Sequence, residues 1–245
     1  MAIRSSEDAY VDQLFGAAPD FGAVLLAAKA PRAFVDLNRC ASELDSSVID
    51  GVISPVGNPR VASGLGVIPR VVSDGRVIRS GKMPKAEAEA RLVRFYHPYH
   101  GALKDILDTT RAAFGKVMLV DCHSMPSAAV NGSAGMFGKM PEVVIGDRFG
   151  ASCERDLVEA VEAALADEGF RVGRNTPFAG AFISREYGRP GMGQNVVQIE
   201  IDRSLYMDEV KIVPHSGFAE MQERLGRVVR EICEIGRWPM QVAAE

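Results

Sequence analysis

The strongest fold signal in the chain is the stretch Val117-Met118-Leu119-Val120-Asp121-Cys122-His123-Ser124-Met125-Pro126. It opens with four apolar residues and is bounded by glycine and proline, which is the pattern of a buried strand. Its polar residues fall toward the carboxyl end of that strand, where open α/β sheets place their ligands. His123 can offer a neutral ring nitrogen to a metal or act as a base, and Asp121 and Ser124 can fix its position through hydrogen bonds. A strand end with a satisfied structural histidine is the alternative.

The composition is that of an ordinary globular protein. The chain has 245 residues, of which 47% are apolar and 24% charged, and its net charge of −4 predicts no broad basic surface for nucleic acid. No run approaches the roughly 18–20 apolar residues of a membrane span, and the first residues lack the apolar core of a signal peptide. The cysteines never form Cys-x-x-Cys, which argues against a disulfide framework and against a cysteine zinc site. We therefore expect a cytoplasmic protein that binds neither nucleic acid nor membrane.

Strands alternate with helices along the chain, which predicts one α/β domain. The expected helices are 7–14, 84–114, 152–168 and 218–235. The expected strands, besides the one that carries His123, are 23–28, 33–37, 142–145, 170–172 and 194–201. Pro98 should kink or break the second helix near His97, because proline lacks the amide that continues the ladder.

Three further positions are candidates for chemistry. Glu200 lies near the end of an apolar strand, and a carboxylate there costs free energy unless it is paired or neutralised. The pair Asn38-Arg39 follows an expected strand and suits a carboxylate ligand, because arginine offers a bidentate fork and asparagine one more donor; a salt bridge at a strand end is the alternative. His97 and His100, three residues apart, could chelate a metal on one helix face, although the spacing favours a kinked helix with interfacial histidines.

Six segments of the chain, taken together, resemble the N-formylglutamate amidohydrolase family. They are Arg4–Asp12, Val35–Arg39, Tyr96–His100, Asp121–Met125, Asn175–Phe178 and Gln198–Met207. The segments occur in the family's order and cover nearly the whole chain, which makes the resemblance specific although each motif alone is weak. The family is related to zinc carboxypeptidases and aspartoacylases. The resemblance therefore implies an α/β fold: a single three-layer α/β/α domain with a mixed central sheet, zinc carboxypeptidase-like (phosphorylase/hydrolase-like).

The same resemblance implies one catalytic zinc ion held by two histidines, a carboxylate and a water. It makes His123 the downstream zinc histidine and Asp8 the carboxylate ligand, with the neighbouring Glu7 as the alternative. It makes Glu200 the general base, which would take a proton from water and pass it to the leaving amine.

Substrate recognition is also implied by the resemblance. Asn38 and Arg39 should bind a substrate carboxylate, and Arg185 and Arg203 are further candidates for anion contacts. The implied ligand is a small anionic amino-acid derivative, and a homo-oligomer is compatible with the sequence.

The chain departs from the family pattern at its start. Family members open with a strand that ends in Pro-His-Ser-Gly and carries the first zinc histidine, and no such text precedes Asp8. Either the given sequence starts inside a longer protein, or this version lacks one ligand and one strand. We expect residues 1–245 to form a single N-formylglutamate amidohydrolase-like domain that lacks this strand and binds zinc weakly. The text Pro214-His215-Ser216-Gly217 lies in a different part of the chain, so we take it as coincidence. His215, His97 or His100 as a substitute third ligand is the alternative.

These observations predict a metal-dependent hydrolase of histidine degradation. It would cleave the amide of an N-formyl or N-acyl acidic amino acid, and N-formylglutamate would give formate and glutamate. Two alternatives stay open: a catalytically impaired family member that binds an acidic ligand or a partner, and a deacylase for another N-acyl amino acid.

Overall fold

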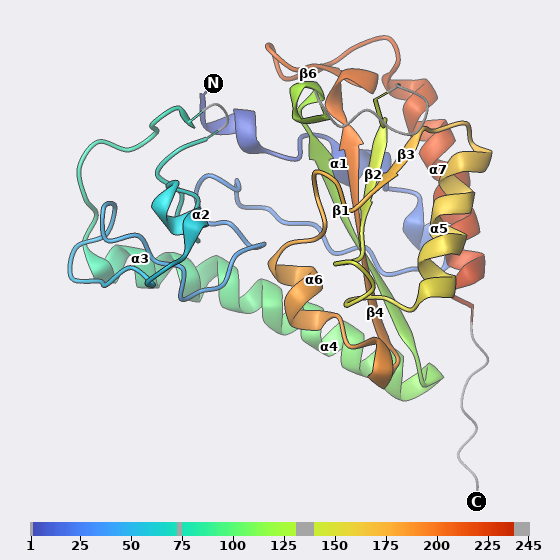
Figure 1. The fold of residues 1–245 in the computed structure, drawn as a ribbon, viewed down its shortest axis with the longest axis horizontal. Coiled ribbons are helices and arrows are strands. Elements are labelled where there is room, and N and C mark those ends of the chain that lie inside the picture. Colours follow the sequence, from blue (N-terminus) through green and yellow to red (C-terminus); the bar gives the residue numbers. More distant parts are fainter. Residues whose placement is uncertain (1, 73–74, 131–139, 238–245) are drawn as a thin grey trace, which may run out of the picture. The chain divides into compact units, whose positions relative to one another are not determined.

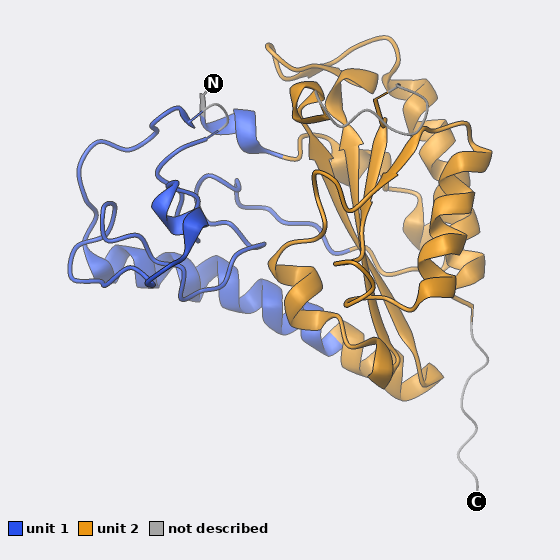
Figure 2. Ribbon diagram, viewed as in Figure 1, with its two compact units in different colours: residues 1–7, 26–105 blue, residues 8–25, 106–245 orange. Residues whose placement is uncertain are grey.

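The computed structural model describes residues 2–72, 75–130 and 140–237. The chain divides into two compact units (Figure 2). Unit 1 consists of residues 1–7 and 26–105, and unit 2 of residues 8–25 and 106–245.

Unit 2 is built around a mixed sheet of four strands (Figure 1). Across the sheet these are β1 (Val117–Met125), β4 (Gln194–Asp202), β2 (Val143–Gly146) and β3 (Val172–Arg174). β1 runs parallel to β4, whereas β2 runs antiparallel to β4 and parallel to β3. The α/β fold with a mixed sheet is therefore confirmed. The strand predicted from the opening stretch is also confirmed, and it continues through His123 to Met125.

Helices cover this sheet on both sides. In Figure 1, α5 and α7 lie on one side and α6 on the other. Their bounds are Arg155–Asp167 for α5, Phe182–Tyr187 for α6 and Phe218–Ile235 for α7. The short helix α1 (Val11–Leu14) contacts both α7 and β1. The expected helices 152–168 and 218–235 correspond to α5 and α7.

The main apolar core lies on the side of α5 and α7. Alternate residues of β4, Val197, Ile199 and Ile201, are fully buried in it. Helix α7 contributes a stripe that recurs every three or four residues and packs on the same core. Its members are Met221, Leu225, Val228, Val229 and Ile232. Burying one such side chain stabilises the fold by about 1.5–3 kcal/mol, so this face fixes the strands that carry the polar face opposite.

A second, two-stranded sheet follows β4 along the chain. The strands β5 (Met207–Asp208) and β6 (Val213–Pro214) pair antiparallel after β4. Short 3-10 turns connect several of the elements of unit 2. They are η2 (Ala18–Phe21), η5 (Ser127–Val130), η6 (Pro190–Met192) and η7 (Arg203–Leu205).

Unit 1 contains short helices joined by turns. They are η1 (Ala2–Ser6), α2 (Pro59–Ala62), α3 (Lys85–Arg91) and the π-helical segment η4 (Leu92–Tyr96). Helix α4 (His97–Phe114) follows η4 and continues into unit 2. The break predicted at Pro98 appears as the π-helical segment that ends just before His97, because a wider turn accommodates a proline that has no amide to donate.

Two predicted strands are wrong. Residues 23–29 have no regular structure, and 32–34 form a turn. The Pro31 carbonyl accepts hydrogen bonds from the amides of Phe34 and Val35 at 2.8 and 3.3 Å, so local turns, and not a sheet, satisfy this apolar run. The strand expected at 170–172 lies two residues later, in β3.

No helix in the described part of the chain has the length and hydropathy of a membrane span.

Candidate active site

The side of the sheet opposite the main core carries a row of polar side chains. Residues that pair across parallel strands point to the same face, and β1 and β4 place His123 beside Glu200 and Asp121 beside Gln198. On β4 the polar residues 198 and 200 alternate with apolar residues that enter the core. One strand therefore supplies both the apolar support and a polar row.

Asp8 contacts the polar row at the carboxyl-terminal part of β1. Its Oδ2 lies 3.0 Å from His123 Nδ1, and its Oδ1 accepts hydrogen bonds from the Ser124 amide at 2.9 Å and the Ser124 hydroxyl at 3.2 Å. The other ring nitrogen of His123, Nε2, lies 2.9 Å from Asp121 Oδ1. The imidazole is therefore held between two carboxylates. The hydrogen-bonding role expected of Asp121 and Ser124 matches these contacts.

This arrangement sets the protonation of the residues around His123. Burial lowers the pKa of His123, but Asp121 and Asp8 together raise it more, so the net pKa lies well above its usual value. Desolvation, with Asp121 and Asp8 nearby, raises the pKa of the Cys122 thiol. Cys122 therefore stays protonated at neutral pH and is not equipped to act as a nucleophile.

Two tyrosines pin the chain beside Asp8. The Tyr206 hydroxyl donates to the Ala9 carbonyl at 3.0 Å, and the Tyr10 hydroxyl donates to the Ile212 carbonyl at 3.1 Å. Tyr206 is fully buried, and this burial raises its pKa to about 12. Because both hydroxyls are used as donors, residues 8–10 are tied to the segment that follows β4.

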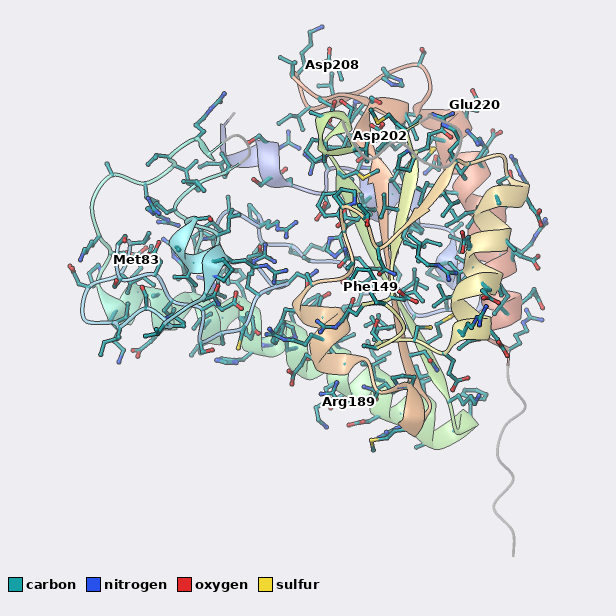
Figure 3. The ribbon with its side chains drawn as sticks, viewed as in Figure 1. Met83, Phe149, Arg189, Asp202, Asp208 and Glu220 are labelled. Atoms are coloured by element: carbon teal, nitrogen blue, oxygen red, sulfur yellow. The ribbon has the colours of Figure 1, made fainter. Side chains whose placement is uncertain are left out.

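Glu200 is fixed from its own strand. The Gln198 side-chain amide donates to Glu200 Oε1 at 2.9 Å, and Gln198 Oε1 accepts from the Ala181 amide at 3.0 Å. Glu200 is 8% exposed. Figure 3 shows Arg189 and Asp202 at the opposite ends of β4, and Glu200 belongs to the Asp202 end.

The two arginines expected to contact anions in unit 2 differ in environment. Arg203 is buried and donates from Nε to the Ser124 hydroxyl at 3.0 Å and from Nη2 to the Ser124 carbonyl at 3.2 Å, with Nη2 3.8 Å from Asp8 Oδ1. Arg185 is exposed on α6, with its guanidinium 5.5 Å from the Phe182 ring centre. Arg203 thus holds the end of β1, while Arg185 faces solvent.

The Asn38-Arg39 pair lies in a turn of unit 1. Asp36 Oδ1 accepts from the Asn38 amide at 2.9 Å, and Asp36 Oδ2 lies 3.8 Å from Arg39 Nε. The Arg39 guanidinium donates from Nε to the Leu65 carbonyl at 3.0 Å and from Nη1 to the Asn38 carbonyl at 2.8 Å. Arg39 is therefore a buried arginine with its orientation fixed by backbone carbonyls.

Glu7 and Asp8, the two candidates for one ligand position, have different partners. The Glu7 carboxylate accepts from Arg4 Nε at 2.9 Å within unit 1, whereas Asp8 binds His123 and Ser124 within unit 2. The geometry brings Asp8, and not Glu7, to the histidine.

A family model described as N-formylglutamate amidohydrolase matches residues 1–207. The chain belongs to the N-formylglutamate amidohydrolase family. A relative described as N-formylglutamate deformylase, from Pseudomonas aeruginosa, is 32% identical over 231 residues, which is 93% of this chain and 80% of the relative. One of the same description from Pseudomonas putida is 32% identical over 208 residues, covering 83% of this chain and 72% of the relative.

A solved structure of a family member is closely similar. The crystal structure of N-formylglutamate amidohydrolase from Ralstonia eutropha JMP134 superimposes with a TM-score of 0.89 at 34% identity, and covers 96% of this chain and 85% of that one.

The described residues do not complete the zinc site that the family resemblance implies. His123 Nδ1 and Asp8 Oδ2 are close enough to share an ion, but no group of three histidine, cysteine, aspartate or glutamate side chains that could hold a metal occurs within residues 2–72, 75–130 and 140–237. A catalytic zinc needs three protein ligands, and a histidine binds the ion through an unprotonated ring nitrogen.

The candidate substitute ligands have local partners of their own. His215 Nδ1 accepts from the Gly217 amide at 2.9 Å and its Nε2 lies 3.0 Å from the Ser204 carbonyl. His100 Nε2 lies 3.0 Å from the Leu37 carbonyl within unit 1, and His97 stacks edge-on to Tyr96. Substitution of the third ligand by any of these three therefore stays a prediction.

Gln198 is the site residue that the sequence reasoning missed. The available signal was the period-2 alternation of a half-polar strand, because residues 198 and 200 of β4 must share a face. A search for charged residues passes over a neutral amide, although an amide can both donate and accept.

Proposed function

We propose that the chain hydrolyses the amide bond of an N-formyl acidic amino acid, most specifically N-formylglutamate, to give formate and the amino acid. The observation that carries the proposal is the juxtaposition of Glu200 on β4 with the Asp8–His123 pair on β1, on the polar face of one sheet. The relatives described as N-formylglutamate deformylase support the choice of substrate.

The part of Glu200 in this reaction is that of a general base. It takes a proton from the attacking water while oxygen bonds to the formyl carbon, and it returns the proton to nitrogen as the carbon–nitrogen bond breaks. Such a carboxylate must be oriented and must retain its charge. The Gln198 amide meets both needs, because it donates one hydrogen bond and brings no opposing charge.

Recognition of the substrate is assigned to arginine side chains. The proposed substrate, a small anionic amino-acid derivative, carries two carboxylates, and Arg39 with Asn38 would bind one of them. Arg39 suits the role because backbone carbonyls already orient its planar fork. Arg185 and Arg203 remain proposed anion contacts.

Zinc dependence is a separate part of the proposal. His123 and Asp8 would supply two ligands, and the third would come from outside the described cluster. We therefore expect purified protein to hold zinc weakly, and elemental analysis after dialysis should give clearly less than one zinc per chain. Full occupancy that resists chelators would contradict this expectation. The cytoplasmic location, the role in histidine degradation and the single family domain are likewise proposed.

The function is tested by measuring formate release. Wild-type protein is incubated with N-formylglutamate, N-acetylglutamate and N-formylglutamine, with and without added zinc. We expect the highest kcat/KM for N-formylglutamate. A higher kcat/KM for the acetyl compound would favour the related deacylase.

A catalytically impaired member that binds an acidic ligand is the second candidate. It is motivated by the incomplete ligand set, because His123 and Asp8 supply two ligands and no group of three such side chains occurs within the described residues. Calorimetric binding of N-formylglutamate without formate release, at any zinc concentration, would support this candidate over the first.

A further inference from the structure

A loop between β3 and α6 lies directly over the polar face of the sheet. A Cβ atom at Gly146 of β2 would come within 2.7 Å of the Ala179 carbonyl carbon and the Gly180 nitrogen. Such a contact allows only glycine on β2 at this point. Phe178 packs against a small apolar cluster that includes Val144, the residue paired with Glu200 across β2 and β4. Residues 178–181, called here the covering loop, are therefore packed onto this face.

The covering loop is joined to Glu200 through Gln198. The Ala181 amide can only donate, so the Gln198 atom 3.0 Å away from it is the carbonyl oxygen. The nitrogen end of the same side chain must then face Glu200, to which it donates at 2.9 Å. Gln198 is only 2% exposed, so water cannot easily replace either bond. One backbone amide thus fixes which end of the glutamine meets the carboxylate.

We infer that Gln198 is a positioning residue for the reaction: it receives its orientation from the Ala181 amide of the covering loop and transmits it to the Glu200 carboxylate. This inference rests on the proposed role of Glu200 as the base. A hydrogen bond from a neutral amide directs one oxygen of the carboxylate without cancelling its charge.

Two substitutions separate the contacts of Gln198. Gln198→Met keeps the length of the side chain and removes both hydrogen bonds. Gln198→Glu keeps an acceptor for the Ala181 amide but removes the donor to Glu200 and adds a negative charge. Gln194→Met is the matched control, because Gln194 lies on the same face of β4 and donates to the Tyr187 carbonyl, away from Glu200.

The first measurement is kinetic. Gln198→Met should lower kcat for N-formylglutamate about 10- to 100-fold, with KM changed less than about threefold, and Gln198→Glu should lower kcat at least as far. Gln194→Met should stay within about twofold of wild type. In a Glu200→Gln background, Gln198→Met should cause little further loss, because a positioning residue acts through the group it positions. Equal, additive losses in both backgrounds would overturn the inference.

The second measurement is structural and does not depend on turnover. Crystal structures of the Gln198 variants should show a changed Glu200 side-chain conformation over an unchanged covering loop, and Gln194→Met should leave Glu200 in place. If wild-type protein releases no formate but Glu200 moves only in the Gln198 variants, the positioning role stands and the proposed function fails. If wild type is active and Glu200 keeps its conformation and its kcat in both Gln198 variants, the positioning role is wrong.

Discussion

Two buried carboxylates, Asp36 in unit 1 and Glu200 in unit 2, are held in different ways. Asp36 is bound by the Arg32 guanidinium at 2.9 Å, by Arg39 at 3.8 Å and by a backbone amide. For Glu200, the hydrogen bond that orients its Oε1 comes from the neutral amide of Gln198. Cations hold a carboxylate in its ionised form and make it a poor proton acceptor. The Gln198 donor is neutral, so it orients Glu200 Oε1 without itself placing a charge beside the carboxylate.

The supports of the two carboxylates differ as well. Asp36 lies between two turns, and the side chains and the amide that bind its carboxylate come from residues close to it in the sequence. Glu200 lies on a regular strand between Ile199 and Ile201, which are fully buried on the other face. We infer that ion pairing fixes the structure around Asp36, whereas the strand that carries Glu200 is fixed by apolar packing on its other face.

The largest expected effect is that of Glu200→Gln. The substitution keeps the size and an acceptor for the Gln198 amide but removes the base, which typically costs about 10²–10⁴-fold in rate. Formate release should fall by this factor, and the urea midpoint of unfolding should stay close to that of wild type. Near wild-type turnover would show that Glu200 is not the base. The functional difference drawn here between Glu200 and Asp36 would then not hold.

The next effect is on stability alone. Ile199→Ala empties a fully buried site on the core face of the same strand, and such changes cost about 2–5 kcal/mol. Urea unfolding should show this loss, while kcat per folded molecule changes little. Ile53→Ala, at an exposed position of unit 1, is the control and should stay within about 0.5 kcal/mol. A large fall in kcat for Ile199→Ala would mean that the two faces of β4 are not separable.

Sequence patterns predicted the parts of the fold that are regular. The apolar run before Asp121 predicted β1, the apolar residues of 194–201 predicted β4, and the 3.6-residue stripe predicted α7, because burial against a core dictates each pattern. Residues 23–28 and 33–37 are equally apolar but lie in irregular or turn structure. The apolar pattern does not show which groups accept hydrogen bonds from their amides. Turn chemistry around Pro31 decided that outcome.

The candidate site was partly visible in the same way. The charged and ionisable residues Asp8, His123 and Glu200 stand out by residue type, and the family motifs give them an order. Contacts between distant segments do not show in the sequence: the choice of Asp8 over Glu7 depends on which of them faces β1. The link from Ala181 through Gln198 depends on the path of the covering loop, which a search by residue type misses.

A smaller effect is expected at Arg39. Arg39→Lys keeps the charge but loses the planar fork, so kcat/KM for N-formylglutamate should fall roughly tenfold, as for the loss of one charge-assisted hydrogen bond. The bonds to the Leu65 and Asn38 carbonyls are also lost, so stability should fall by about 1–2 kcal/mol. Arg32→Lys, which alters the other cation at Asp36, is the control. If Arg32→Lys lowers kcat/KM equally, or if an uncharged N-formyl amide is as good a substrate, Arg39 does not read the substrate carboxylate.

The smallest and most selective effect concerns the acid stability that Asp36 provides. Burial raises the pKa of Asp36. The charges of Arg32 and Arg39, with hydrogen bonds from Arg32 and the Asn38 amide, lower it by more than burial raises it, so the folded-state pKa lies below the ordinary value of 3.8. A carboxyl group with a depressed folded pKa contributes stability that is fully present above its unfolded pKa and disappears as the pH falls through the folded value. Asp36→Asn should therefore be less stable than wild type at pH 7 and pH 5, and the difference should shrink below about pH 4. Urea midpoints followed by circular dichroism at pH 7, 5, 4 and 3 measure this, with the exposed pair partner Glu89→Gln as the control whose difference stays near zero at each pH. If the difference between Asp36→Asn and wild type is the same at every pH, the shape of the side chain, and not its charge, stabilises this region. The description of Asp36 as an ion-paired carboxylate would then be wrong.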